Sequence, residues 1–212
     1  MYDFLMRVPL LSWASYCALK QIVGLIHFIK LEKLDAVYLI HLASRLSVLA
    51  FLLLLVIATI LRTRPSNKAS GLEPRISALV GTFLIYGIVL FPQRELSLSL
   101  EIISTLLIIV GTIGAIVALS RLGRSFSVMA ETRQLVTSGP YRLVRHPLYL
   151  TEEIAIFGMF MQFASIWTVL ILALQITFQL RRIHNEEAIL TEAFPEYSMY
   201  REATNRLIPG VW

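Results

Sequence analysis

Uncharged stretches long enough to cross a bilayer make up much of this chain. Asp, Glu, Lys and Arg are absent from residues 46–61, 76–93, 102–120 and 154–180. Several of these runs approach the roughly 20 residues that span a hydrocarbon core. The pattern predicts an all-α, polytopic membrane helix bundle of about six spans, organised as a single integral-membrane domain over residues 1–212.

Composition agrees with this class. Apolar residues make up 57% of the 212 residues and charged residues 16%, with a mean hydropathy of +0.71. A soluble domain carries about 25% charged residues, so this chain lacks the surface that such a domain needs. The lone Cys17 cannot form an internal disulfide, and no paired cysteine or histidine spacing indicates a metal site. The net charge is +5, but the basic residues are distributed by membrane side, which is not a nucleic-acid signal. We therefore expect membrane lipid as a partner, without nucleic acid or metal.

Of the two N-terminal spans, the first is the weaker prediction. Lys20 interrupts residues 9–29, which therefore either cross the membrane or lie in its interface. A polar turn at 30–35 follows, and the second span covers about 36–61. Arg45 within it faces the bundle or, in the simpler interpretation, water at the membrane boundary. The first residues lack the basic region of a secretory signal, so no cleaved signal peptide is expected.

The third and fourth spans cover about 76–91 and 97–120, with a tight turn between them. Glycine lets helices approach closely in membranes. Four glycines lie in these spans: Gly81, Gly87, Gly111 and Gly114.

The run 154–180 allows two interpretations, one long helix or a hairpin. A hairpin bending near Ala164-Ser165 would have arms at about 147–163 and 166–190. It places fourteen basic residues on one side of the membrane and three on the other, whereas a single helix gives ten against seven. The positive-inside rule therefore favours the hairpin, with a cytoplasmic C-terminal helical tail. The polar stretch before residue 147 then lies beside that tail, facing the cytoplasm.

The polar stretch 137–149 is the first place to look for chemistry. Pro147 fits the first turn of a helix, which places Arg145 and His146 just before a helix start. Such a start can seat an anionic group. The alternative is an interfacial loop with arginines reaching water and tyrosines in the aromatic belt.

The tail offers a second set of charges. Arg182 and Glu186 are four residues apart and share a helix face. They form either a surface ion pair of little energetic value or the second half of a site with His146 and Tyr149. Leu190, Phe194, Tyr197 and Tyr200 supply an apolar face that we interpret as packing, and we interpret His27 and His41 as structural.

These segments together resemble a known family. The motif combines Leu135-Val136-Thr137-Ser138-Gly139-Pro140-Tyr141, Arg145-His146-Pro147-Leu148-Tyr149, Arg182 with Glu186-Glu187, and the spaced Leu190, Phe194, Tyr197 and Tyr200. It resembles the isoprenylcysteine carboxyl methyltransferase family over about residues 122–209. Thr151 and Pro195 depart from the family pattern, which commonly has a small residue, often glycine, at the first position and usually glycine at the second.

The resemblance implies methyl transfer from S-adenosylmethionine to a lipophilic small molecule or lipidated acceptor, with residues 121–212 as the methyltransferase core. By similarity Arg182 would bind the substrate carboxylate and act in catalysis. A carboxylate acceptor needs no general base, because it is already ionised, but it needs in-line placement. The cofactor site implied by the resemblance comprises Arg133, Gln134, Leu135, Val136, Tyr141, His146, Pro147, Tyr149 and Glu186.

Two other functions are compatible with these residues. A membrane reductase of the sterol type has a similar Arg-His-Pro-like block and tyrosine-rich tail, and would use NADPH. A non-catalytic membrane accessory protein could keep the same fold. The intact set of Arg182, Glu186 and His146 favours the methyltransferase.

Overall fold

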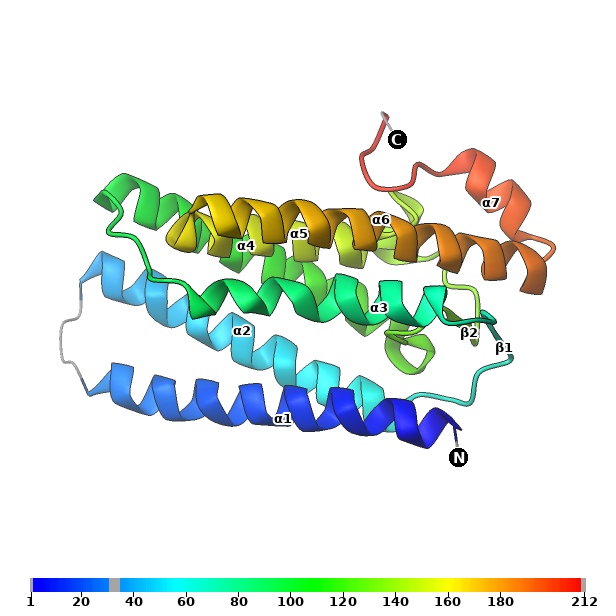
Figure 1. Cartoon of the computed structure of the whole chain (residues 1–212), viewed down its shortest axis with the longest axis horizontal. Helices are drawn as coiled ribbons and strands as arrows, with labels where there is room; N and C mark the ends of the chain where they lie inside the picture. The colour runs from blue at the N-terminus through cyan, green and yellow to red at the C-terminus, as the bar shows by residue number, and fades with distance from the viewer. Residues whose placement is uncertain (1, 31–34, 211–212) are drawn as a thin grey trace.

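Helices account for nearly all the regular structure of the protein (Figure 1). The computed structural model describes residues 2–30 and 35–210, and side chains from Arg7 onward within those ranges, so part of the turn predicted at 30–35 lies outside it. The prediction of an all-α chain is confirmed. The elements are α1 (Tyr2–Ile29), α2 (Ala36–Leu61), β1 (Asn67–Lys68), α3 (Glu73–Phe83), the 3-10 helix η1 (Leu84–Leu90), α4 (Leu98–Leu122), η2 (Gly123–Ser125), β2 (Glu131–Thr132), η3 (Gly139–Arg142), α5 (Pro147–Phe163), α6 (Ile166–Ala193) and α7 (Tyr197–Ala203).

Within the described residues, four helices are long and apolar enough to cross a membrane. They are α2, α3 continued by η1, α4 with η2, and α6. α5 has only 17 residues, fewer than the roughly 20 that span a hydrocarbon core. The polytopic class is therefore supported, while membrane crossing by α1 and α5 stays a prediction.

The outer faces of the long helices are apolar. In α2, Leu39, Leu46, Leu53 and Ile60 recur every seven residues and are each about half exposed. Burying one such side chain from water stabilises a protein by roughly 1.5–3 kcal/mol, so a soluble protein would not leave this stripe uncovered. The stripe therefore fits contact with lipid.

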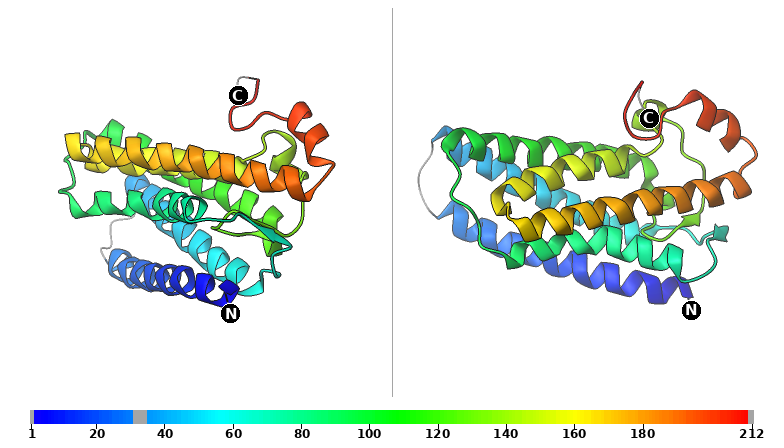
Figure 2. Two further views of the ribbon diagram at one scale, coloured as in Figure 1. Left: turned by 45° about the vertical axis from the view of Figure 1, so that its right-hand side comes forward. Right: turned by 45° about the horizontal axis from the view of Figure 1, so that its top comes forward.

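The predicted C-terminal hairpin is confirmed. α5 ends at Phe163 and α6 begins at Ile166, after the expected break at Ala164-Ser165. The Ser165 hydroxyl accepts from Thr168 N, and Thr168 Oγ1 accepts from Ser165 N, which caps the start of α6. From this break the arms diverge (Figure 2), because α5 packs mainly on α4 and α6 mainly on α3.

α4 and α5 cross at small residues. A Cβ added at Gly111 would lie 2.4 Å from the backbone N of Ala155, and one at Gly158 would lie 2.6 Å from the carbonyl of Ser104. At Gly114 the nearest atom would be Thr151 Cγ2, at 2.5 Å. The expected close approach therefore occurs at Gly111 and Gly114, and Gly158 adds another. A Cβ at Gly81 would likewise lie 3.3 Å from the backbone N of Gln179 on α6. The α4–α5 contact fixes which face of α5 is turned away from α4.

Both chain ends lie at the same end of the bundle (Figure 1). The loop after α2 lies there too, since β1 pairs antiparallel with β2. Ser66 N donates to Thr132 O at 2.8 Å, and Ala69 N donates to Ala130 O at 2.9 Å. The segments carrying most basic residues are thus gathered at one end, as the hairpin requires.

Replacing Gly111 by alanine should destabilise the bundle. The new methyl would meet the backbone of α5, which cannot rotate away, so the helices must separate at a cost of about 1–3 kcal/mol. Thermal unfolding of detergent-purified protein would show a lower Tm. Gly87→Ala is the matched control, because the nearest atom to its methyl is Ile171 Cδ1 at 4.0 Å. Equal Tm values for the two variants would contradict the described crossing.

Candidate active site

The polar stretch and the tail lie side by side, as the hairpin predicted. Arg145 N donates to Asn205 O at 2.8 Å, and His146 N donates to Arg206 O at 3.0 Å. Val144 and Asn205 form a parallel bridge. Backbone hydrogen bonds therefore place the residues before α5 against the end of the chain.

A single carboxylate, that of Glu187 on α6, joins these segments. Its Oε1 accepts from Arg145 Nε at 2.8 Å and lies 3.2 Å from His146 Nε2, while its Oε2 accepts from Arg206 at 2.6 Å. The Glu187 side chain is 7% exposed. A buried carboxylate is costly unless it is paired, and here three basic side chains supply the pairing.

The start of α5 orients two aromatic rings. Pro147 occupies the first turn, as expected from its missing N–H. The rings of His146 and Tyr149 then stack at 5.5 Å between centroids. The Tyr149 hydroxyl donates a hydrogen bond to Glu186 on α6, which links the two arms of the hairpin next to the polar stretch.

Arg182 lies one helical turn before Glu186 on α6. Its guanidinium sits 4.6 Å above the ring of Tyr149, and its Nε is 3.3 Å from Glu186 Oε1. It also donates to Thr82 Oγ1 at 3.0 Å and to the carbonyl of Ser127 at 3.4 Å. The ion pair predicted at 182 and 186 is therefore present, with Arg182 buried rather than on the surface.

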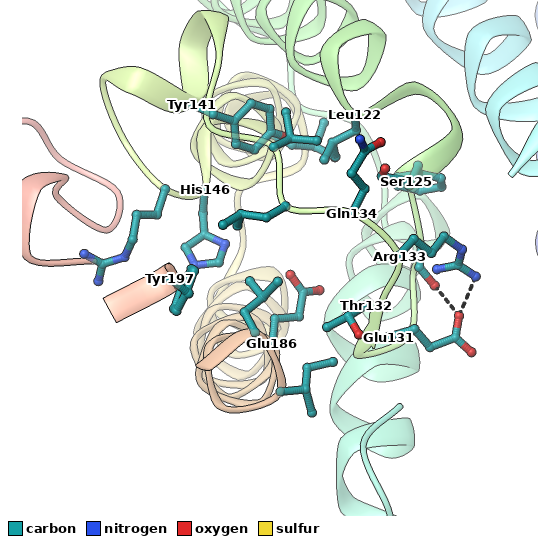
Figure 3. A pocket seen from close by; sticks show the side chains of 18 of the residues that line it. Leu122, Ser125, Glu131, Thr132, Arg133, Gln134, Tyr141, His146, Glu186 and Tyr197 are labelled. Atoms are coloured by element: carbon teal, nitrogen blue, oxygen red, sulfur yellow. Dashed lines mark hydrogen bonds and ion pairs between the residues drawn. The ribbon is translucent and has the colours of Figure 1, made fainter. Parts of the chain in front are cut away.

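One cavity collects most of the predicted site residues (Figure 3). Pro147 and Arg182 are not part of its lining, although Arg182 contacts both Tyr149 and Glu186, which are. Glu186 reaches into the cavity from α6, opposite Tyr141 (Figure 3). Eight of the ten predicted residues line the cavity: Arg133, Gln134, Leu135, Val136, Tyr141, His146, Tyr149 and Glu186.

The guanidinium of Arg133 already has protein partners. It donates to Glu131 Oε2 at 2.7 Å and to the carbonyl of Thr63 at 2.7 Å (Figure 3 shows the first). Ser127 Oγ donates to the same Glu131 oxygen. Arg133 thus supports the wall of the cavity and ties it to the loop after α2.

Two tyrosine hydroxyls in the lining are buried without a partner. Among the described residues, neither Tyr141 Oη nor Tyr197 Oη has a hydrogen-bond partner. Burial, reinforced by the charges of Glu186 and Glu187 respectively, raises the pKa of each phenol, so both stay protonated donors at neutral pH. Unpaired buried polar atoms cost free energy, and a polar ligand in this cavity would offset that cost.

Sequence reasoning missed the roles of Glu187 and Glu131. The Glu186-Glu187 doublet was visible, but neighbouring helical positions point about 100° apart, and only the fold shows which carboxylate faces the cavity. Glu131 lies in the two-residue strand β2, where no periodic pattern indicates a role.

A second cavity lies at the opposite end of the bundle. His41, Arg45, Arg94, Glu95 and Glu101 are among its lining residues. His41, which the sequence left without a partner, lies 3.0 Å from Glu101 Oε1, and the guanidinium of Arg45 lies over the Phe28 ring at 4.7 Å. These contacts show no link to the first cavity.

Comparison with known proteins identifies the part of the chain that builds the first cavity. Residues 103–192 match the model of the isoprenylcysteine carboxyl methyltransferase (ICMT) family. This segment holds most of α4 and α6, all of α5 and the loops between α4 and α5.

Two curated proteins are also similar. The chain is 34% identical over 112 residues to the cobalt-zinc-cadmium resistance protein CzcN of Cupriavidus metallidurans, covering 50% of this chain and 51% of that protein. It is 33% identical over 112 residues to the nickel-cobalt-cadmium resistance protein NccN of Alcaligenes xylosoxydans xylosoxydans, covering 50% and 52%. The chain spans about half the length of the curated relatives it matches. Within residues 2–30 and 35–210, no three His, Cys, Asp or Glu side chains are arranged to hold a metal ion.

Glu187→Gln should loosen the tail from the cavity. It removes the charge that Arg145 and Arg206 share, and breaking a buried pair costs about 3 kcal/mol or more. We expect a lower Tm and faster amide hydrogen exchange over residues 197–206. Glu192→Gln, an exposed acid on the same helix, is the control. Unchanged exchange in Glu187→Gln would show that this carboxylate does not hold the tail.

Proposed function

We propose that this chain, whose residues 103–192 match the isoprenylcysteine carboxyl methyltransferase family, is a membrane methyltransferase that uses S-adenosylmethionine. The acceptor is a lipophilic molecule, of which an isoprenylcysteine carboxylate is the one that the family name gives. The observation that carries the proposal is the cavity in which Glu186, His146 and two unpaired tyrosine hydroxyls meet.

The charges around the cavity suit the cofactor. Glu186 brings a carboxylate to one wall, which favours the ammonium and sulfonium groups of S-adenosylmethionine. Arg145, another lining residue, shares a single carboxylate with Arg206, so positive charge is left over on the tail side. A zwitterionic amino acid end would lie between these walls with its charges matched. The hydroxyls of Tyr141 and Tyr197 would gain the partners that they lack.

The protein's part in the reaction is placement. When bound, the cofactor supplies an activated methyl group on its sulfonium sulfur. Glu186, held by Tyr149 and Arg182, would fix the cofactor relative to α5. The apolar lining residues Leu135, Val136 and Leu190 limit water in the cavity. Holding two reactants in line can contribute several kcal/mol to a rate, so a rigid Glu186 matters more than an extra catalytic group.

Cofactor titration separates the methyltransferase from its two alternatives. Purified protein should bind S-adenosylmethionine in isothermal calorimetry, and NADPH should produce no heat of binding. Glu186→Gln should weaken binding about tenfold or more, as the loss of a charged hydrogen bond predicts. Tyr141→Phe should weaken it by a smaller factor, and Glu192→Gln should leave it unchanged. Binding of NADPH alone would favour the reductase, and binding of neither would favour the accessory protein.

The membrane orientation is a second part of the proposal. Basic residues gather in the segments at the end of the bundle that holds both termini, so we propose that this end and its cavity face the cytoplasm. Reporter domains inserted after residue 165 and at the C-terminus should then fall on opposite sides. A cytoplasmic signal from both positions would show that the hairpin does not cross the membrane.

A further inference from the structure

A carboxylate without a bonded partner lies inside the bundle, one turn below the cavity. Glu152 on α5 is partly buried, and its side chain makes no hydrogen bond or ion pair with the described residues. The next residue differs, since Glu153 accepts from Gln175 Nε2 at 2.8 Å. An ionisable residue within a membrane bundle is costly and usually functional. Glu152 therefore needs an explanation that Glu153 does not.

The packing of α5 defines where Glu152 faces. Thr151 and Ala155 take the face that touches Gly111 of α4. Glu152 lies about 100° further round the helix, three residues after Tyr149. The charged groups close enough to act on its carboxylate are Arg182 and Glu186 on α6 and Glu153 on α5. Three tyrosines also face it: Tyr149 on α5, Tyr141 before α5 and Tyr86 on η1. Tyr86 in turn lies near Cys17 of α1. The side chain thus lies among groups of α5, α6 and η1, close to Tyr149 and Glu186 of the cavity lining.

A row of polar side chains on α6 runs from Glu186 toward the contact with α3, where Gln175 Nε2 lies 3.4 Å from Gly81 O. Gln175, Gln179, Arg182 and Glu186 follow one another at intervals of four, three and four residues, which is one face of a helix. The Oε1 atoms of Gln175 and Gln179 are buried and have no hydrogen-bond partner among the described residues. Polar side chains therefore continue along α6 from Glu186, which lines the cavity, to Gln175, which bonds Glu153 of α5.

The charges around Glu152 determine which chemical group of a methyl acceptor could bind beside it. Arg182 is the positive group there, and it is close to two carboxylates, Glu186 and Glu152. It is further held by Thr82 and by the ring of Tyr149. A carboxylate acceptor would bring a third anion to one guanidinium, whereas a neutral donor would form a charge-assisted hydrogen bond with Glu152.

We propose that Glu152, together with Arg182, binds the reacting group of the methyl acceptor, and that this acceptor is a lipophilic phenol or thiol rather than a carboxylate. The inference rests on the proposed methyl transfer. As the acceptor oxygen or sulfur bonds to the methyl carbon, the bond from methyl to sulfonium sulfur breaks, and the acceptor proton passes to the Glu152 carboxylate. Phenols and thiols have pKa values of roughly 10 and 8.5, so they need such a proton acceptor at neutral pH.

A matched pair of probes tests the acceptor class by binding alone. Para-nonylphenol and para-nonylbenzoic acid share ring and chain and differ in the polar group. Wild-type protein in detergent should bind the phenol at least about tenfold more tightly than the benzoate, as one charged hydrogen bond predicts. Glu152→Gln should reverse this preference, because removing the negative charge weakens the phenol bond and frees Arg182 for the benzoate. Glu153→Gln should keep it, since that acid is already bonded to Gln175.

Reversal of preference is a readout that general loosening of the bundle would not produce. Tighter benzoate binding in wild type, equal behaviour of the two variants, or no binding of either probe would overturn the inference. Titration with S-adenosylmethionine tests the proposed methyltransferase function separately from the acceptor class. Glu152→Gln is expected to bind the cofactor as tightly as wild type does. If wild-type protein binds the cofactor but the probe experiment fails, the proposed methyltransferase function is retained and only the acceptor class is rejected.

Discussion

The Glu187 carboxylate is the constraint on which the rest of the site depends. It is buried, and its oxygens are shared among Arg145, His146 and Arg206. Removing any one segment would leave the others with unpaired charge at low dielectric, which is far costlier than a surface pair. The wall of the cavity before α5 and its cover after α6 are therefore one unit. Glu186, the next residue, can face the cavity because its neighbour has already fixed the helix.

Close packing on one side of α5 explains the polar character of the other. Gly111 and Gly158 bring α4 and α5 into backbone contact, so that face of α5 has no room for functional side chains. α6 packs on α3 instead and leaves α5 along the bundle (Figure 2). Tyr149, Glu152 and Glu153 lie on the face that remains. Two helix pairs thus flank the polar face of α5, while the segment between α4 and α5 supplies most of the cavity lining.

The hairpin and the pairing of the polar stretch with the tail were predictable from local signals. Pro147 marked a helix start, and the distribution of basic residues selected the bend at 164–165. Contacts set by tertiary packing were not predictable. His41 meets Glu101 sixty positions away, and the two acids Glu186 and Glu187 differ only in angle around one helix. Whether α1 and α5 cross the membrane also depends on neighbours, because Lys20 and the shortness of α5 weaken the hydropathy signal.

Several unpaired buried polar atoms among the described residues lie at the cavity and along α6, and their placement carries information about the ligand. Tyr141 and Tyr197 hold unpaired hydroxyls in the cavity, and Gln175 and Gln179 hold unpaired carbonyls beyond it. If these side chains served packing alone, an apolar side chain of similar size would cost less folding free energy than an unpaired polar one. The cavity lining holds unpaired tyrosine hydroxyls and the unpaired Glu131 Oε1, whereas the unpaired atoms of Gln175 and Gln179 are acceptors alone, so the two parts suit different chemistry. An ionic cofactor matches the first, and a neutral molecule that donates a hydrogen bond matches the second, where Glu152 adds the strongest acceptor.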